Sequence, residues 1–397
     1  MTSVSTELIN KKASLVKYII LNSLERQGFF IDDAKEIKIL RSSNNKEIIR
    51  SLHSSFKNDK LIRNVSFLRN NFDALKKHIA NGADIVTNDF APVMIPVEKE
   101  EEYSRLFRFA SLLWSIPVSE GFGRRTRFLV IDSANDKLVG IFALGDPVFN
   151  LSPRDKHIGW THKQRSKRLY HVMDVFVLGA IPPYSNLLCG KLIAMLAASN
   201  EVRTLIYNKY KDTRSVILGE KREPNLVFLT TSSALGKSSL YNRIKFHNEL
   251  LYRRIGETEG WGHFHVSDNT LSEMKELLIM MQHPIVKRNR FGQGPNWKMR
   301  LIRTCLQKID LSPRILRHGI RREVYGVSLA ENYRTFLLGL EDQIKSYDFP
   351  ASTMISFFKE RWFFPRSRRN ESYKIIKADE TLSNLYYYSR QPLGENQ

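Results

Sequence analysis

Residues 171–193, HVMDVFVLGAIPPYSNLLCGKLI, contain the transition that decides the fold. Residues 171–181 are an apolar run of strand length, and a Pro-Pro pair ends it. From residue 190 to 210 the apolar side chains recur with the period of a helix. A buried strand followed by a turn and a helix is typical of α/β and α+β proteins, so we expect a sheet at the centre of the chain.

Further strands are expected on both sides of this unit. Residues 126–132 and 137–146 flank the turn sequence SAND and predict a hairpin, and residues 225–233 predict a fourth strand. We expect a fifth strand at 261–267 and, between the last two strands, a helix at 237–246. This order of elements predicts an α+β domain.

The rest of the chain differs in composition from this central part. Residues 1–95 are polar with apolar side chains at helical spacing, and residues 271–397 are basic and mainly helical in pattern. A chain of 397 residues is long enough for two or three domains. We therefore predict a helical N-terminal module (1–95), a central mixed-sheet domain (96–270) and a basic, mainly helical C-terminal module (271–397).

Positive charge is the strongest feature of the composition. The chain has 62 Lys and Arg against 41 Asp and Glu, and residues 286–370 alone hold 18 basic and 7 acidic side chains. Such asymmetry favours a polyanionic partner, usually nucleic acid; an anionic membrane surface and a solubilising excess of charge are the alternatives. We expect DNA binding, with these contact residues: Arg288, Arg290, Lys298, Arg300, Arg321, Arg322, Arg366, Arg368 and Arg369.

Cysteine content and hydropathy predict a cytoplasmic protein. Only two cysteines are present, far apart in the chain, which excludes a disulfide framework and a four-cysteine zinc site. The first ten residues are polar and lack the pattern of a secretory signal. No apolar run approaches the roughly 18–20 residues of a membrane helix, so we expect no membrane partner.

A phosphate-binding loop is suggested and then rejected at residues 230–243, TTSSALGKSSLYNR. Residues 236–238 are the Gly-Lys-Ser that ends a P-loop. The glycine required five positions earlier is Thr231, and a β-branched residue cannot readily adopt the backbone conformation needed there. We therefore do not expect a nucleotide at this loop.

The same part of the chain resembles the GCN5-related N-acetyltransferase (GNAT) fold. Residues 182–193 resemble the loop and helix start that bind the cofactor pyrophosphate, and residues 237–246 resemble a helix with a conserved tyrosine. The matching positions are Pro182, Tyr184, Gly190, Tyr241 and Phe246. The resemblance implies a GNAT-like mixed sheet, cofactor contacts at Tyr184, Gly190 and Lys191, and a general acid at Tyr241.

Departures from this pattern weaken the expectation of a cofactor. Leu188 replaces a glycine that lets the backbone approach the phosphates, and Ser185 replaces a long polar side chain. Lys245 also stands where the tyrosine-containing motif usually has glycine. Acetyl-CoA is the cofactor that the fold implies, and we expect it to bind weakly or not at all.

Longer strings of uncommon sequence occur along most of the chain, at residues 114–132, 144–160, 172–192, 230–243, 260–265, 291–300, 317–325 and 360–366. These strings resemble the DruA family of the Druantia antiphage defence system. The resemblance implies a role in bacterial defence against phage, together with partner proteins that include a large helicase. It implies no particular chemistry.

Acidic residues near strand ends are candidates for chemistry. Asp146, Asp155 and Asp174 could hold magnesium or act as a base, but turns explain Asp146 and Asp155 equally well. Asp174 lies inside an apolar strand, where a carboxylate is costly unless it is paired. His263 and His265 could ligate a metal, but a third ligand is not evident, so we expect no metal site.

Aromatic residues alternate with basic ones in the C-terminal module. Trp297 and Trp362 each lie among Arg and Lys, a pattern that suits stacking on bases and is also compatible with core packing. Three mechanisms follow in order of preference. The protein is a nucleic-acid-binding recognition subunit on a degenerate acyltransferase-like core, or an active transferase that modifies a nucleobase or a protein amine, or a metal-dependent nuclease.

Overall fold

The computed structural model describes residues 3–33, 37–39, 46–98, 100–116, 123–214, 219–263, 265–287 and 296–392. Contacts between Cα atoms divide the chain into two compact units. Unit 1 comprises residues 1–59, 234–236 and 257–322, and unit 2 comprises residues 60–233, 237–256 and 323–397. No helix among the described residues is long and apolar enough to cross a membrane.

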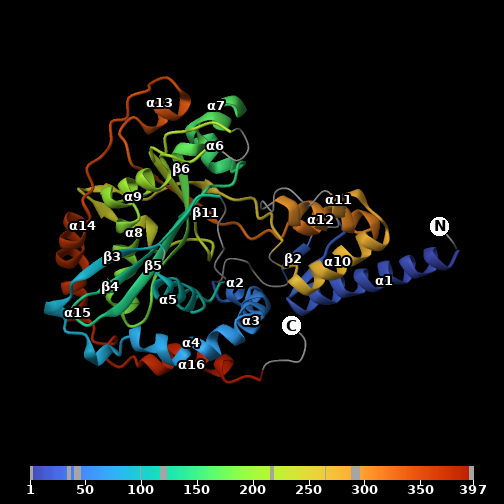
Figure 1. Cartoon of the computed structure of the whole chain (residues 1–397), viewed down its shortest axis with the longest axis horizontal. Coiled ribbons are helices and arrows are strands. Elements are labelled where there is room, and N and C mark those ends of the chain that lie inside the picture. The colour runs from blue at the N-terminus through green and yellow to red at the C-terminus, as the bar shows by residue number, and fades with distance from the viewer. Residues whose placement is uncertain are drawn as a thin grey trace. The chain divides into compact units, whose positions relative to one another are not determined.

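Unit 2 contains a seven-stranded sheet with the order β10-β11-β7-β6-β5-β4-β3 (Figure 1). The strands from β3 to β6 pair antiparallel, β6 and β7 pair parallel, and β7 and β11 pair antiparallel. The mixed sheet confirms the α+β class. Its strands are β3 (Pro92–Val97), β4 (Arg125–Asp132), β5 (Lys137–Gly145), β6 (Val172–Ala180), β7 (Phe228–Ser232), β10 (Arg253–Glu257) and β11 (Glu323–Ser328).

Four of the five strands expected from the sequence are confirmed as β4, β5, β6 and β7. The expected strand at 261–267 is wrong for residues 261–263 and 265–267, where Trp261 makes only an isolated bridge with Arg317. Gly260 has a φ of +74°, and a Cβ there would lie 2.8 Å from the backbone of Gly319. This close backbone crossing bends the segment away from a regular ladder.

The helix expected at 190–210 is confirmed as two helices, α8 (Cys189–Leu196) and α9 (Asn200–Tyr210). Ser199 separates them, and its side chain accepts the amide of Val202 as the N-cap of α9. The two helices form the crossover between the parallel strands β6 and β7.

The helix expected at 237–246 is wrong. Ser238 Oγ accepts the amides of Leu240 and Tyr241, and the chain continues into a 3₁₀ turn, η6 (Tyr241–Arg243). A short hairpin of β8 (Lys245–Phe246) and β9 (Glu249–Leu250) follows. Both residues of its turn, His247 and Asn248, have positive φ, as a type I′ turn requires.

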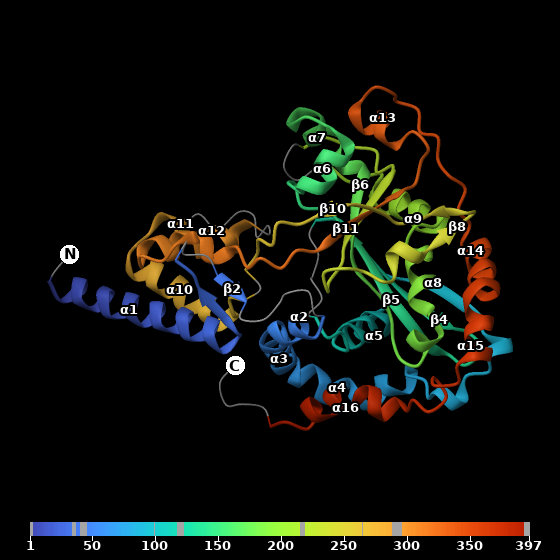
Figure 2. The ribbon, with the colours of Figure 1, turned by 180° about the vertical axis from the view of Figure 1, so that it is seen from behind.

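Helices cover both faces of the sheet (Figures 1 and 2). Successive side chains of a strand point to opposite faces, so Phe128 of β4 joins the core under α8, whereas Leu129 joins the core under α5. Helix α14 packs on α8, and α16 packs on α4. These further helices are α4 (Val65–Leu75), α5 (Glu101–Ser111), α14 (Ala351–Phe358) and α16 (Ala378–Ser389).

Shorter elements complete unit 2. Between β5 and β6 the chain forms two helices, and α13 packs against both of them. A π-helical turn joins α14 to α15 without a break. These elements are α6 (Ser152–Ile158), α7 (His162–Arg168), α13 (Tyr333–Leu338), η8 (Lys359–Phe363) and α15 (Phe364–Arg369).

Unit 1 is mainly helical. Helix α10 packs between α1 and α12, and the small antiparallel pair β1–β2 contacts α1 through β1. The elements are α1 (Ser3–Arg26), β1 (Phe29–Ile31), β2 (Ile37–Ile39), α2 (Lys46–Leu52), α3 (Ser54–Ile62), α10 (Asp268–Met280), α11 (Pro284–Lys287), α12 (Asn296–Lys308) and η7 (Pro313–Leu316).

Candidate functional site

Asp174 lies where the parallel strands of the sheet separate. β6 and β7 pair only over residues 172–174 and 228–230, and Asp174 is in the last pair. Its Oδ1 accepts a hydrogen bond from Thr230 Oγ1 at 2.9 Å. Burial raises the pKa of Asp174 to about 6, although the Thr230 bond and the charge of Arg154 favour the ionised form.

Tyr241 lies near enough to Asp174 for the carboxylate charge to act on its hydroxyl. Its ring stacks on Tyr252, with centroids 4.9 Å apart, and meets Tyr325 at 5.1 Å. Burial raises the pKa of Tyr241 to about 12, a hydrogen bond with Thr231 opposes the rise, and the charge of Asp174 adds to it. The raised pKa and the contacts with two aromatic rings are typical of a tyrosine in the protein core.

Asp146 is committed to an ion pair at the end of β5. Its Oδ1 lies 2.8 Å from Arg124 Nε, and its Oδ2 accepts the backbone amide of Arg124 at 3.0 Å. The same guanidinium donates to the carbonyl of Tyr170 and lies over the Tyr170 ring, 3.8 Å from its centroid. This pairing fixes the strand end and occupies the carboxylate.

The proposed cofactor loop is held by contacts within the protein. Tyr184 is fully buried, and its hydroxyl donates to Asp132 Oδ2 at 2.8 Å. The carbonyl of Asn186 accepts Nε of Arg366 at 3.0 Å. Leu188 has a φ of +65°, the left-handed conformation that favours the glycine of the acyltransferase motif.

The start of α8 is covered by other segments of unit 2. Lys191 Nζ donates to the carbonyl of Arg243 at 3.3 Å and lies 4.4 Å from the ring centroid of Trp362. A Cβ at Gly190 would meet only the Leu240 side chain, at 3.7 Å, so packing does not require glycine there. Contacts within the chain therefore occupy the groups of this loop and of the first turn of α8.

Helix α12 presents a basic surface in unit 1. Arg300, Arg303 and Lys308 are exposed, whereas Lys298 pairs with Asp268 at 3.2 Å. The helix has no acidic residue. Its opposite face is buried through Leu301, Ile302, Cys305 and Leu306.

The other predicted contact residues of unit 1 differ in exposure. Arg321 is exposed. Arg322 donates from Nη2 to His53 Nε2 at 3.2 Å, and burial lowers the pKa of Arg322. Arg322 therefore supports the packing of unit 1. Arg288 and Arg290 lie outside the described residues.

Helix α15 carries the predicted contact residues of unit 2. Arg368 and Arg369 are exposed, whereas Arg366 is half-buried and bonded to Asn186. Trp362 of η8 and Trp297 of α12 are both half-buried. Each tryptophan therefore packs on one side and has part of its surface in solvent.

The two histidines considered as metal ligands, His263 and His265, lie in unit 1, where His265 is buried and His263 is partly buried. His265 and His318 have ring centroids 6.2 Å apart, and burial lowers the pKa of His265 to about 3 and of His318 to about 2. Burial also lowers the pKa of His263. Within the described part of the chain, no three His, Cys, Asp or Glu side chains are grouped to hold a metal.

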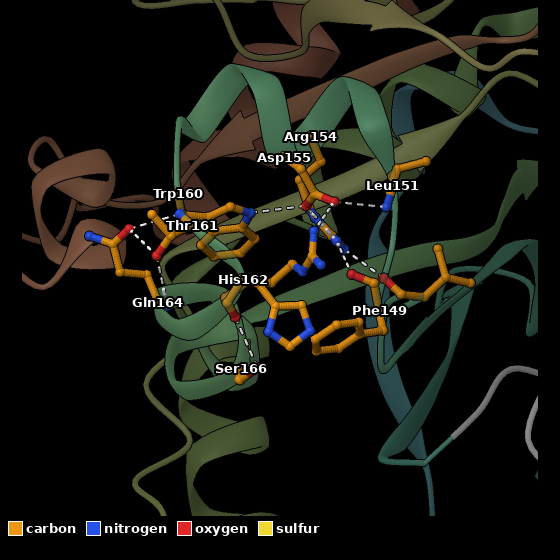
Figure 3. A network of polar contacts seen from close by, with 11 residues as sticks. Phe149, Leu151, Arg154, Asp155, Trp160, Thr161, His162, Gln164 and Ser166 are labelled. Atoms are coloured by element: carbon orange, nitrogen blue, oxygen red, sulfur yellow. Dashed lines mark hydrogen bonds and ion pairs between the residues drawn. The ribbon is translucent and has the colours of Figure 1, made fainter.

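A buried charge network at α6 was not foreseen as a unit. Asp155 accepts Arg154 Nε at 2.9 Å, Arg165 Nη1 at 2.8 Å, Trp160 Nε1 at 3.0 Å and the Leu151 amide at 3.0 Å (Figure 3). The Arg154 side chain is completely buried. The sequence shows only a mostly basic stretch here, and charged side chains are normally solvated, so nothing in the local pattern predicts their burial.

Comparison with known proteins identifies the family. No solved structure matches this chain. The family described as Druantia protein DruA matches residues 43–339. The Druantia protein DruA of Escherichia coli (strain UMEA 4076-1) is 39% identical over 371 residues, which cover 93% of this chain and 91% of that protein. The chain therefore belongs to the family of Druantia protein DruA.

Proposed function

We propose that this protein is a component of a Druantia antiphage defence system and acts in it by binding DNA through unit 1. Membership of the DruA family supports the role in defence. The partners that this role implies are the other Druantia components, including a large helicase, and the place of action is the cytoplasm.

The exposed cations of α12 are the observation that carries the DNA-binding proposal. Arg300, Arg303 and Lys308 extend from a helix whose other face is buried, so the helix is fixed while its charges face solvent. Phosphate groups of duplex DNA bind to such cations with release of counterions. Arg321 of unit 1 and Arg368 and Arg369 of α15 are further candidates.

The core of unit 2 is proposed to be an acyltransferase-like scaffold without its cofactor. An antiparallel run of four strands, a parallel pair that separates, and a helix following the first strand of that pair support the GNAT-like description. The contacts of Asn186 with Arg366 and of Lys191 with Trp362 argue against a cofactor in the loop.

Active group transfer is the second candidate function. It is favoured by the proximity of Asp174 to Tyr241, which is close enough for the carboxylate charge to raise the tyrosine pKa. For the nuclease alternative, the residues that the structure describes include no group of three or more His, Cys, Asp or Glu side chains that could hold a metal ion.

The salt dependence of DNA binding tests the proposal. Each phosphate contact adds about 0.9 to the slope of log affinity against log salt concentration. The triple variant Arg300→Gln, Arg303→Gln, Lys308→Gln should therefore lower the slope for duplex DNA by up to about 2.7. The control replaces three exposed cations on other helices of unit 1 by Gln, namely Lys11, Arg26 and Lys275. If both triple variants lower the salt slope equally, or if neither lowers it, α12 is rejected as the contact surface.

A further inference from the structure

The outer side of α12 carries uncharged polar groups as well as positive charge. Four polar side chains share this side at positions i, i+3, i+4 and i+7 of the helix, namely Arg300, Arg303, Thr304 and Gln307. Thr304 is half-buried and the other three are exposed. The phosphate contacts proposed above use the arginines and give no role to Thr304 or Gln307.

The opposite side of α12 is fixed in the core of unit 1. Four apolar side chains there are at most 1% exposed, namely Leu301, Ile302, Cys305 and Leu306. Lys298, on the same side, pairs with Asp268 of α10 at 3.2 Å. Helix α10 packs against α12 (Figures 1 and 2). The core thus fixes which side chains α12 presents to solvent.

The dimensions of α12 suit the major groove of duplex DNA. That groove is about 12 Å wide and admits an α-helix with its side chains. From Arg300 to Gln307 the helix rises about 10 Å, the length of about three base pairs. The helix has no acidic residue, and none of the large apolar side chains exposed in the described structure belongs to it. Its outer side therefore has no group that would repel a polar, anionic groove.

The residue types on this side are those that read base edges. Arginine donates two hydrogen bonds to O6 and N7 of guanine, and glutamine bonds in a bidentate way to N6 and N7 of adenine. Threonine can contact the methyl group of thymine. Contact with phosphates alone would require only positive charge, whereas Gln307 can exchange hydrogen bonds with a base.

Cations beside this side of the helix suit the phosphates that border the groove. Lys308 is exposed at the end of α12, and Arg314 is exposed on η7, which contacts α12. Phosphate contacts fix the register of a protein on the duplex, whereas base contacts select the sequence. This part of unit 1 therefore offers residues for both kinds of contact.

We propose that α12 is a recognition helix that enters the major groove, where Arg300, Arg303 and Gln307 contact the base edges of about three base pairs that include guanine and adenine. The proposal rests on the proposed function in one respect, that unit 1 binds duplex DNA. It adds that this binding prefers particular sequences.

Two substitutions that preserve the charge of α12 test the proposal in the full chain. The wild type first selects a preferred duplex from a pool with a randomised centre. Gln307→Ala and Arg303→Lys should each weaken binding of that duplex about fivefold to 150-fold, since lysine keeps the charge but cannot form the bidentate contact. Affinity for a scrambled duplex and the salt slope should not change. The matched control, Asn10→Ala, removes an exposed amide from α1 and should leave both affinities unchanged.

Base analogues test whether the contact lies in the major groove. The selected duplex is prepared with 7-deazaguanine and 7-deazaadenine, which lack the N7 acceptor and leave every phosphate in place. The wild type should bind this duplex at least about fivefold more weakly than the unmodified one. Equal affinity for the two duplexes would overturn contact with base edges in the major groove.

The outcomes separate this inference from the proposed function. Weaker binding of the selected duplex by both variants, with unchanged binding of the scrambled duplex, supports the inference. If no sequence is enriched, or if both variants bind the selected duplex like the wild type, the inference is overturned alone, and salt-dependent duplex binding still supports the proposed function. A wild-type chain that binds no duplex overturns both. A thermal melt at the wild-type temperature confirms that each variant is folded.

Discussion

Three charged side chains that are fully or partly buried are held by three different kinds of partner. Arg154 pairs with the carboxylate of Asp155, Arg322 donates to a neutral histidine, and Asp174 accepts a hydroxyl. Of the three, only Asp174 was recognised from the sequence as unusual, because it interrupts an apolar strand. Burial of the two arginines depends on partners in the folded chain, which local composition does not reveal.

Asp174→Asn should stabilise the protein at alkaline pH. The folded-state pKa of Asp174 is raised from 3.8 to about 6, so its stabilising contribution is complete below about pH 4 and is lost as the pH rises through 6. Asparagine is neutral and can still accept the Thr230 hydroxyl. The free energy of unfolding, measured by urea titration at pH 8, should rise by about 1–3 kcal/mol and match the wild type at pH 4. A loss of stability at pH 8 would show that the ionised carboxylate is required.

The buried histidines of unit 1 should make the protein sensitive to acid. Burial lowers the folded-state pKa of His53, His265 and His318 to about 3, 3 and 2. The unfolded chain binds these protons below about pH 6.5, so stability is complete above that pH and falls as the pH drops toward 3.

One of these histidines can be tested by replacement. His53→Gln should reduce the slope of unfolding free energy against pH between 4 and 6 by about 1.4 kcal/mol per unit, since one proton fewer is taken up on unfolding. Replacing the exposed Asn10 of α1 by Gln is the control and should leave this slope unchanged, because neither side chain binds a proton in this range. Equal slopes for wild type and His53→Gln would show that proton uptake by His53 does not cause the acid sensitivity.

At the scale of elements, prediction from sequence succeeded where both faces of a strand are buried. The cores on the two sides of β4, β5 and β6 produce near-continuous apolar runs, which are easily recognised. Prediction failed at 237–246, where Ser238 bonds to nearby amides and a two-residue turn follows. The positive φ of His247 in that turn has no sequence signal, and only Asn248 is a residue that such turns prefer.

The loop before α8 should not bind acetyl-CoA. Its groups already contact Arg366, Trp362 and Arg243, which a cofactor would have to displace. Leu188→Gly restores the residue of the acyltransferase motif and relieves a left-handed leucine, a strain of about 1–2 kcal/mol. Calorimetric titration should show no binding tighter than about 1 mM for the wild type or the variant. Low-micromolar affinity in the wild type would contradict the scaffold proposal and favour group transfer.

At the scale of the whole molecule, sequence order and spatial order differ. β10 and β11 are neighbours in the sheet although residues 258–322 lie between them, and unit 1 is assembled from three separate parts of the chain. Composition along a linear sequence cannot reveal that the segment between two neighbouring strands of the sheet belongs to the other unit. Family membership and the excess of positive charge were both evident from the sequence, because long strings and net charge do not depend on the fold.

We propose that the protein contributes to defence by binding DNA through unit 1, and that the centre of unit 2 performs no chemistry. Protection of cells against phage, in a strain with the remaining Druantia components, distinguishes this role from a catalytic one. Two variants are compared at equal protein level: Arg300→Gln with Arg303→Gln and Lys308→Gln, and Asp174→Asn with Tyr241→Phe. If DNA binding by unit 1 is the contribution, the α12 variant loses protection and the Asp174/Tyr241 variant retains it. Full protection by the α12 variant, together with loss of protection in a folded Asp174/Tyr241 variant, would show instead that chemistry in unit 2 is required.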